Sequence, residues 1–242
     1  MTESPLEIAW LGRVGYAAAL ALQDELVDRR RRDQVADRLL LLEHDPVLTF
    51  GRRTGARHLL ADRGELAARG IELVETDRGG DITYHGPGQL VGYLILRLVG
   101  SERSVPRLFE RLERGVVDTL ASYGIASCGG TRRPADATAA ALQLAGVWVG
   151  RDKICALGLR LSDWITKHGL ALNVDPELSE FELIVPCGLA DRGVTSMRRL
   201  LGAAPPAAEL RQRLAEDLAG ALERRPVWLR SSSLDTLFRP PL

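Results

Sequence analysis

The sequence predicts one mixed α/β domain in which a mixed β-sheet packs against helices. Three observations lead to this prediction. The 242 residues fall within the range of a single α/β domain. Hydrophobic residues make up 45% of the chain, which is enough for a substantial core. Short apolar runs alternate with amphipathic stretches, and we find no internal repeat or low-complexity linker between them. Across residues 1–242, the one subdivision that we expect is a small helical subdomain from about residue 203.

The first part of the chain predicts a strand, a helix and a second strand. Residues 8–11 form a short apolar run, and residues 16–32 have the spacing of an amphipathic helix. Four arginines end this helix, and we interpret them as cations suited to a helix C-terminus rather than as a nucleic-acid patch. Four consecutive leucines make residues 37–43 a buried strand, and we expect a polar loop at residues 49–53.

A short helix, a strand and a glycine-rich loop come next. Residues 60–69 predict the helix, which Gly70 ends, and residues 71–76 alternate as a strand. Residues 77–89 then hold four glycines and a proline, which allow close backbone approach and leave several N–H groups free. The spacing matches neither a phosphate-binding loop nor a dinucleotide fingerprint. A substrate loop and a structural turn are both compatible with it.

The second half predicts two strands, a long helix, a hairpin and a terminal helix. Residues 90–98 form an apolar strand, and Ser104 and Pro106 then begin a helix that Gly124 ends. Residues 131–138 predict a mobile excursion. The remaining predicted elements are a hairpin and two single segments, over residues 147–149 with 153–161, residues 168–174 and residues 206–225.

Bulk composition excludes several classes of function. Basic and acidic residues balance at 32 each, so nothing global indicates a nucleic-acid or anionic-membrane partner. No apolar run approaches the ~20 residues of a membrane helix, and we expect no signal peptide. Three widely spaced cysteines do not resemble a disulfide framework, which favours a reducing, cytoplasmic location. No residues have metal-ligand spacing, so we expect neither a metal nor a cofactor.

Cys187 is the candidate nucleophile. An apolar, strand-like run leads into a turn flanked by proline and glycine, where a thiol is exposed and still held in place. Lys153 is the candidate base. It opens a strand whose alternation places it on one face with Cys155, Leu157, Leu159 and Leu161. Partial burial on that face favours the neutral amine, which accepts a proton from a thiol.

Residue types alone leave other pairings open. A Cys–His pair is the commoner catalytic arrangement, so Cys187 with His85 or with His168 competes with Cys187 and Lys153. Cys155 is the rival nucleophile, although its position within a strand is typical of a packed thiol. Cys128 lies on a flexible turn and has no base nearby in the sequence.

Five motifs in the same order resemble the octanoyltransferases of lipoate biosynthesis. They are RGGDITYHGPGQ at residues 78–89, GVWV at 146–149 with KI at 153–154, LG at 157–158, HGLALNV at 168–174 and IVPCG at 184–188. HDPVLTFGR at residues 44–52 looks like the opening loop of that family. The resemblance covers about residues 6–215.

This resemblance implies a fold like the catalytic domain of biotin and lipoate protein ligases. It places the catalytic cysteine on Cys187 and the catalytic lysine on Lys153. It places the acyl pocket on Arg78, Gly79, Gly80, Asp81, Ile82, Thr83, Tyr84, His85, Ala156, Leu157, Gly158, Gly169, Leu170 and Ala171. The chain departs from the family pattern at Cys155, where a small residue such as alanine is usual, and at residues 131–141, which are longer than expected.

The implied reaction is transfer of an octanoyl (or lipoyl) group through a cysteine thioester, as the first step of endogenous lipoate biosynthesis. The implied donor is octanoyl-acyl carrier protein. The implied acceptors are the lipoyl domains of 2-oxoacid dehydrogenase acyltransferase subunits and the glycine cleavage H protein. No ATP is required, since a thioester is already activated. Two alternatives are an ATP-dependent lipoate–protein ligase, which needs no cysteine, and a non-catalytic protein that binds carriers or lipoyl domains.

Overall fold

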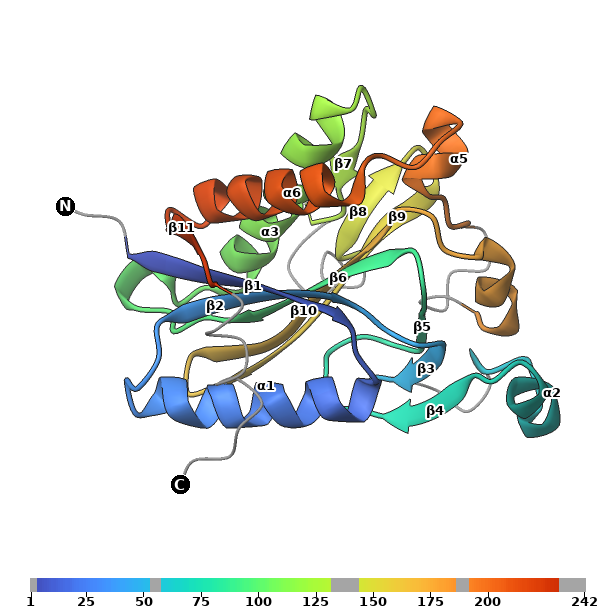
Figure 1. Cartoon of the computed structure of the whole chain (residues 1–242), viewed down its shortest axis with the longest axis horizontal. Coiled ribbons are helices and arrows are strands. Elements are labelled where there is room, and N and C mark those ends of the chain that lie inside the picture. The colour runs from blue at the N-terminus through green and yellow to red at the C-terminus, as the bar shows by residue number, and fades with distance from the viewer. Residues whose placement is uncertain (1–3, 53–57, 132–143, 186–191, 231–242) are drawn as a thin grey trace.

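The computed structural model describes residues 4–52, 58–131, 144–185 and 192–230 (Figure 1). Eight strands in these ranges form one large sheet of order β11-β1-β2-β6-β10-β9-β8-β7. In chain order they are β1 (Pro5–Arg13), β2 (Asp37–Glu43), β6 (Gln89–Ile95), β7 (Cys128–Gly129), β8 (Gly146–Val149), β9 (Asp152–Ser162), β10 (Ile165–Asn173) and β11 (Arg225–Trp228). A smaller sheet of order β4-β3-β5 contains β3 (Val47–Phe50), β4 (Glu72–Glu75) and β5 (Thr83–His85).

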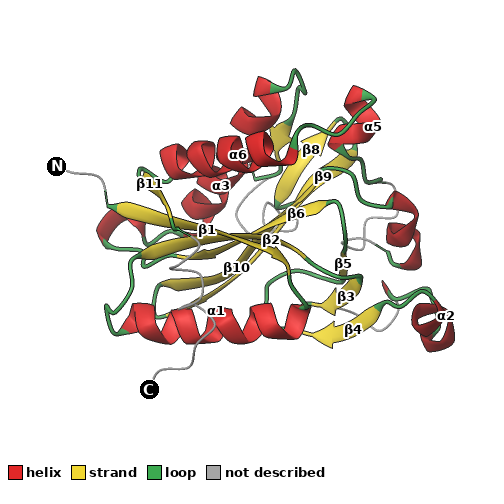
Figure 2. Ribbon diagram, viewed as in Figure 1, coloured by secondary structure: helices red, strands yellow, loops and turns green. Residues whose placement is uncertain are grey.

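Helices cover both faces of the large sheet (Figure 2). Helix α1 (Tyr16–Arg31) lies on one face, and α3 (Val105–Ser122) and α6 (Ala207–Ala221) lie on the other. The remaining helices are α2 (Arg63–Ala68), α5 (Met197–Leu201) and the 3₁₀ turns η2 (Gly100–Glu102) and η3 (Leu178–Leu183). No helix in the described ranges is long and apolar enough to cross a membrane.

Strand β2 explains why the chain carries four leucines in a row. Leu39 and Leu41 enter the core under α3 and α6, whereas Leu40 and Leu42 enter the core under α1. A strand buried on both faces needs apolar residues at every position rather than at every second one. The prediction of a buried strand at these residues is confirmed.

Most predicted elements match the structure in type and position. The long helix begins after Ser104, with Pro106 in its first turn, and Gly124 follows its end with φ of 77°. The helix predicted from residue 60 begins later, at Arg63, because Asp62 caps it by accepting a hydrogen bond from the Glu65 amide at 2.8 Å. The excursion predicted at residues 131–138 lies, after Thr131, outside the described residues.

Four strands were not predicted. Strand β7 begins at Cys128, which we expected on a flexible turn, and it pairs with β8. Strands β3 and β5 fall in segments that we expected to be loops, and they pair with each other across 35 residues of sequence, as in Leu48 with Tyr84. Strand β11 follows the last helix and pairs in parallel with β1. Short strands of this kind depend on tertiary pairing, which single-segment propensity does not report.

Helix α6 buries its apolar side in the same core as α3.

The hairpin of β8 and β9 contains an irregularity at its start. Val147 pairs with Cys155 and Trp148 pairs with Lys153, so Ile154 is an extra residue on β9. Ile154 and Cys155 both lie in the core under α3 and α6. The predicted alternation from Lys153 to Cys155 is therefore wrong. The bulge turns Lys153 away from the face of Cys155 and beside Trp148, its cross-strand neighbour.

Candidate active site

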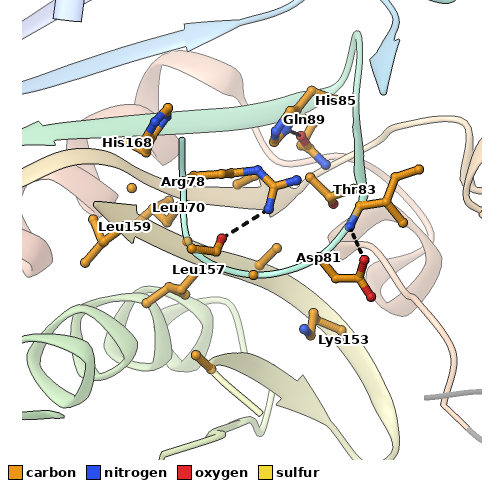
Figure 3. A pocket seen from close by; sticks show the side chains of 18 of the residues that line it. Arg78, Asp81, Thr83, His85, Gln89, Lys153, Leu157, Leu159, His168 and Leu170 are labelled. Atoms are coloured by element: carbon orange, nitrogen blue, oxygen red, sulfur yellow. Dashed lines mark hydrogen bonds between the residues drawn. The ribbon is translucent and has the colours of Figure 1, made fainter. Parts of the chain in front are cut away.

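A cavity of about 780 Å³ opens beside β9 and β10 (Figure 3). Small residues of β9 and β10 form part of its floor. Ala156 pairs with Ala171 and Gly158 pairs with Gly169 across the two strands, so two successive rows on one face carry almost no side chain. Leu157, Leu159 and Leu170 line the cavity as well, and they make a further part of its wall apolar. The arrangement suits an unbranched aliphatic chain.

The glycine-rich segment covers this floor. The Gly79 amide donates to the Leu159 carbonyl at 2.9 Å, and a Cβ built on Gly158 would lie 2.9 Å from the Gly79 oxygen. A Cβ on Gly51 would lie 2.4 Å from the Gly80 oxygen. Glycine is required at these positions because three backbone segments touch there. The glycine-rich stretch is thus both a tightly packed turn and the roof of the cavity.

Arg78 fixes the conformation of this roof. Its guanidinium donates to the Thr49 carbonyl at 2.7 Å, to the Thr49 hydroxyl at 2.8 Å and to the Gly79 carbonyl at 3.2 Å. The side chain is buried, and in the view of Figure 3 it lies between His168 and Lys153. Hydrogen bonds from a cation to backbone oxygens are strong, so Arg78 holds β3 and the roof together.

His168 anchors the beginning of the roof. It is a buried residue with φ of 65°, a left-handed conformation that is uncommon outside glycine. Its amide donates to Gln23 Oε1 at 2.8 Å, and its Nε2 lies 2.6 Å from Asp77 Oδ1. Burial lowers the pKa of His168 to about 4 despite the Asp77 carboxylate beside it. Burial of Asp77 raises the pKa of its carboxyl group. The neighbouring His168, Lys167 and Arg160 outweigh this effect and lower that pKa to about 2.

His85 begins a directional chain of hydrogen bonds. Its Nδ1 lies 2.6 Å from Gln89 Oε1, Gln89 Nε2 donates to Asn173 Oδ1 at 2.9 Å, and Asn173 Nδ2 donates to the Thr195 carbonyl at 3.1 Å. The Thr195 amide donates in turn to the Lys153 carbonyl at 3.0 Å. Burial lowers the pKa of His85 to about 3, so its ring is neutral and its Nδ1–H is the donor.

A second polar cluster lines or backs the cavity. His44 Nδ1 donates to the Val14 carbonyl at 2.6 Å, and His44 Nε2 accepts from the Tyr93 hydroxyl at 2.7 Å. The Tyr16 ring stacks on His85 at 6.1 Å between centroids. Burial lowers the pKa of His44 and raises the pKa of Tyr93 and Tyr16, so the cluster is neutral near pH 7. These positions were missed from the sequence, where only the family-like opening loop pointed to His44.

Lys153 lies at the edge of the cavity and is 8% exposed. Its ammonium stands 4.7 Å from the centroid of the Trp148 ring. Both its backbone amide and its backbone carbonyl form hydrogen bonds with the segment that follows residues 186–191. The Lys153 amide donates to the Gly193 carbonyl at 2.9 Å, and the Thr195 amide donates to the Lys153 carbonyl at 3.0 Å.

Cys187 lies outside the described residues, but the residues on either side of its segment are placed. On one side, the Val185 amide donates to the His58 carbonyl at 2.8 Å. On the other side, the Arg192 guanidinium stands 4.9 Å from the Trp148 centroid, and Val194 bridges to Lys153. The chain that returns from Cys187 is therefore fastened to the strand that carries Lys153.

The other two cysteines differ in their surroundings. Cys155 is fully buried, its Sγ lies 3.6 Å from the Ala156 carbonyl, and burial raises the pKa of its thiol to about 12. Such a thiol is a packing group rather than a nucleophile, as predicted. Cys128 is exposed at the sheet edge on β7.

The structure brings together thirteen of the fourteen residues predicted for the acyl pocket. They line one cavity with Lys153, together with unpredicted residues such as Val105, Phe109 and Phe181. The exception is Tyr84, whose ring packs edge-on against Phe181 at 5.5 Å in the core of the small sheet. Within the described ranges, no group of three His, Cys, Asp or Glu side chains is arranged to hold a metal.

Comparison with known proteins shows the family and the fold. Residues 15–219 match the lipoyl protein ligase A/B catalytic domain. The chain is 48% identical to the octanoyltransferase of Chloroflexus aggregans, over 92% of this chain and 97% of that protein. It is 41% identical to the mitochondrial octanoyltransferase LIP2 of Arabidopsis thaliana, over 95% and 94% of the two chains. A bipartite lipoate protein ligase of Thermoplasma acidophilum shares the fold, with a TM-score of 0.71, 17% identity and coverage of 98% of this chain and 91% of that one.

Proposed function

The chain belongs to the lipoyl protein ligase A/B catalytic domain family, and we propose that it transfers octanoyl groups through a thioester on Cys187 with Lys153 as the proton acceptor. It is an acyltransferase that moves octanoyl or lipoyl groups. Its fold is that of the lipoate protein ligases. The cysteine intermediate and the roles of individual residues are the proposed part.

The observation that carries this proposal is the backbone pairing of Lys153 with residues 193–195. Cys187 follows Val185 by two residues and precedes Arg192 by five, so its segment is short between two fixed points. Gly193 and Thr195, which follow Arg192 closely, bond to the Lys153 amide and to the Lys153 carbonyl respectively. Few residues are then available to carry the thiol away from the lysine, which supports a Cys187–Lys153 pair.

The state of the histidines supports lysine as the base. A general base works best when its pKa lies near the operating pH. Burial holds the pKa of His85 at about 3 and that of His168 at about 4, and each ring is already engaged, with Gln89 and Asp77 respectively. Neither ring is suited to take a proton from a thiol near pH 7. Lys153 therefore remains the better candidate of the three pairings.

The proposed reaction has two steps. Lys153 accepts the Cys187 proton, and the thiolate attacks the octanoyl carbonyl. The new carbon–sulfur bond to Cys187 forms as the bond to the donor thiol breaks, and Lys153 returns the proton to that thiol. The acceptor lysine then attacks the acyl-Cys187 carbonyl. An amide bond forms, the bond to Cys187 breaks, and the amine proton passes through Lys153 to the thiolate.

The cavity supplies the place for the acyl chain. In this proposal the octanoyl tail lies in the cavity that residues 80–83 and the Ala156–Ala171 row line, beside the contact of Gly79 with Gly158. Backbone N–H groups close to the reacting carbonyl would stabilise the oxyanion, as in other acyl transfers. Arg78, Asp77 and His168 keep the roof in position and touch no reacting atom in this scheme.

The partners and the location are also proposals. The donor is octanoyl-acyl carrier protein. The acceptors are lipoyl domains of 2-oxoacid dehydrogenase acyltransferase subunits and the glycine cleavage H protein. The protein acts as one catalytic domain, supported by a family match over residues 15–219 and a core shared by α3 and α6. Free thiols at Cys128 and Cys155 support a reducing compartment such as the cytoplasm.

Intact mass spectrometry tests the proposal. Mixing the protein with octanoyl-acyl carrier protein should add one octanoyl group, which peptide mapping should place on Cys187 and which Cys187→Ser should abolish. Adding a lipoyl domain should move the group to that domain without ATP or magnesium. The matched arm contains free octanoate, ATP and magnesium. If that arm modifies the lipoyl domain faster, the protein is an ATP-dependent ligase and the thioester proposal is wrong.

A further inference from the structure

We propose that Trp148 and Arg192 form a positioning unit for Lys153, in which one buried indole ring fastens the catalytic lysine and the segment returning from Cys187 to the same surface. This inference rests on the proposed function of Lys153. Neither Trp148 nor Arg192 is among the residues that line the cavity, so both act through Lys153 rather than on the acyl chain.

Trp148 is built as a rigid platform. It is 1% exposed, and its indole Nε1 donates to the Leu144 carbonyl at 2.9 Å. A Cβ on Gly130 would lie 2.9 Å from the same Nε1, so the residue that follows β7 packs directly against the edge of the ring. Burial and a hydrogen bond from the indole N–H together restrict the orientation of the ring. The contacts that fix the ring are therefore independent of Lys153.

Two cationic side chains make cation–π contacts with this ring. Lys153 Nζ stands 4.7 Å from the centroid, and Arg192 Cζ stands 4.9 Å from it. Both distances lie within the range in which an aromatic ring attracts a cation. The two cations come from different parts of the chain, one from β9 and one from the segment after residue 191. A single ring thus links the lysine to the chain that returns from the nucleophile.

The bulge in β9 creates this arrangement. It makes Lys153 the direct cross-strand neighbour of Trp148 and separates it from the core-facing Cys155. Lysine has a flexible four-carbon stem and can place its amine in many positions. The ring restricts those positions, and the backbone bonds from residues 193 and 195 hold the strand beneath. The Arg192 charge also adds a positive potential beside Lys153, which favours the thiolate that the proposed function places there.

Four variants separate positioning from folding. Arg192→Met removes the second cation and keeps the stem, whereas Arg192→Lys restores a cation. Trp148→Leu removes the ring, whereas Trp148→Phe keeps an aromatic face. Arg211→Met is the matched control, because Arg211 stacks on Trp10 at 4.1 Å and lies outside the cavity lining. Each variant is measured as the full chain by the rate of octanoyl-Cys187 formation from octanoyl-acyl carrier protein across pH.

We expect Arg192→Met to move the midpoint of the acid limb upward by about half a unit to one unit. We expect Arg192→Lys to restore the wild-type midpoint. Trp148→Leu should slow acyl-enzyme formation about tenfold at its best pH, and Trp148→Phe should recover most of that rate. Arg211→Met should change neither quantity. A loss of packing alone would lower the amount of active protein without moving the midpoint.

The outcomes are distinguishable. If the wild-type protein forms no adduct on Cys187, the proposed function fails. If the adduct forms but Arg192→Met and Trp148→Leu match Arg211→Met in midpoint and rate, the positioning unit is refuted while the proposed function stands. If Trp148→Leu does not fold, judged by its thermal melt, the Arg192→Met and Arg192→Lys midpoints decide alone.

Discussion

Mild acid should destabilise this protein, because two of the histidines that surround the cavity are buried as neutral rings. Burial lowers the pKa of His85 from 6.5 to about 3 and that of His168 from 6.5 to about 4. In the unfolded chain both take up a proton below about pH 6.5. The folded state binds fewer protons between pH 4 and 6.5, so stability falls as the pH falls through that window.

The magnitude follows from these pKa values. Between pH 7 and pH 5, a histidine with an unfolded pKa of 6.5 and a folded pKa of about 3 or 4 loses about 2 kcal/mol of folding free energy. The two together lose about 4 kcal/mol, a large share of a typical total of about 5–15 kcal/mol. The buried Glu113 carboxylate, whose pKa is raised by burial, takes up a proton more readily in the folded state and offsets part of this loss.

Burial and the groups that face the two rings together determine whether the pKa of each histidine is raised or lowered. His85 is faced by His44, Arg78, His168 and the Gln89 amide, and these contain no carboxylate that would hold its proton. His168 is faced by Asp77, which favours protonation, and by Lys167 and Arg78, which oppose it. Burial outweighs the Asp77 contribution, so both rings stay neutral at pH 5.

Urea unfolding at pH 7 and pH 5 measures the effect. The midpoint should fall by between about 1 and 2 M urea on going to pH 5. His85→Gln and His168→Gln should each lower stability at pH 7 and should each remove about half of the pH dependence. The reasoning would be refuted if the wild-type urea midpoint moved by less than about 0.3 M between the two pH values and neither variant changed this pH dependence. That result would show that the rings are protonated or hydrated in the folded state.

Three further predictions concern the site. Lys153→Arg should lower acyl transfer by about 10²–10⁴-fold, because arginine retains the charge but cannot accept a proton near pH 7; near-normal turnover in a single-turnover assay would make Lys153 an electrostatic partner only. Cys155→Ala should leave transfer within about twofold of wild type, since burial raises the pKa of that thiol to about 12, and an octanoyl adduct on Cys155 that survives Cys187→Ser would contradict the assignment. Gly158→Val should slow transfer of octanoyl more than of butanoyl, because its Cβ would fall 2.9 Å from the Gly79 oxygen and displace the roof of the cavity; equal slowing of both chains, measured as kcat/KM, would place the acyl chain elsewhere.

The sequence by itself determined the elements with strong periodicity and the residues with distinctive chemistry. The leucine run of β2, the spacing of α3 and the turn of the β8–β9 hairpin each depend on neighbours within one segment. Residue types alone left the glycine-rich segment open between a substrate loop and a structural turn, and the pocket positions on β9 and β10 came from the family resemblance.

Only the tertiary structure decided which of those residues act together. Strands β3 and β5 exist because they pair with each other, and the bulge at Ile154 turns Lys153 from the face of Cys155 to the ring of Trp148. The tertiary structure also placed Tyr84 in a core rather than in the cavity and made both catalytic histidine candidates neutral. Pairing, burial and proton affinity sum contributions from segments that are remote in sequence, so no single segment carries that information.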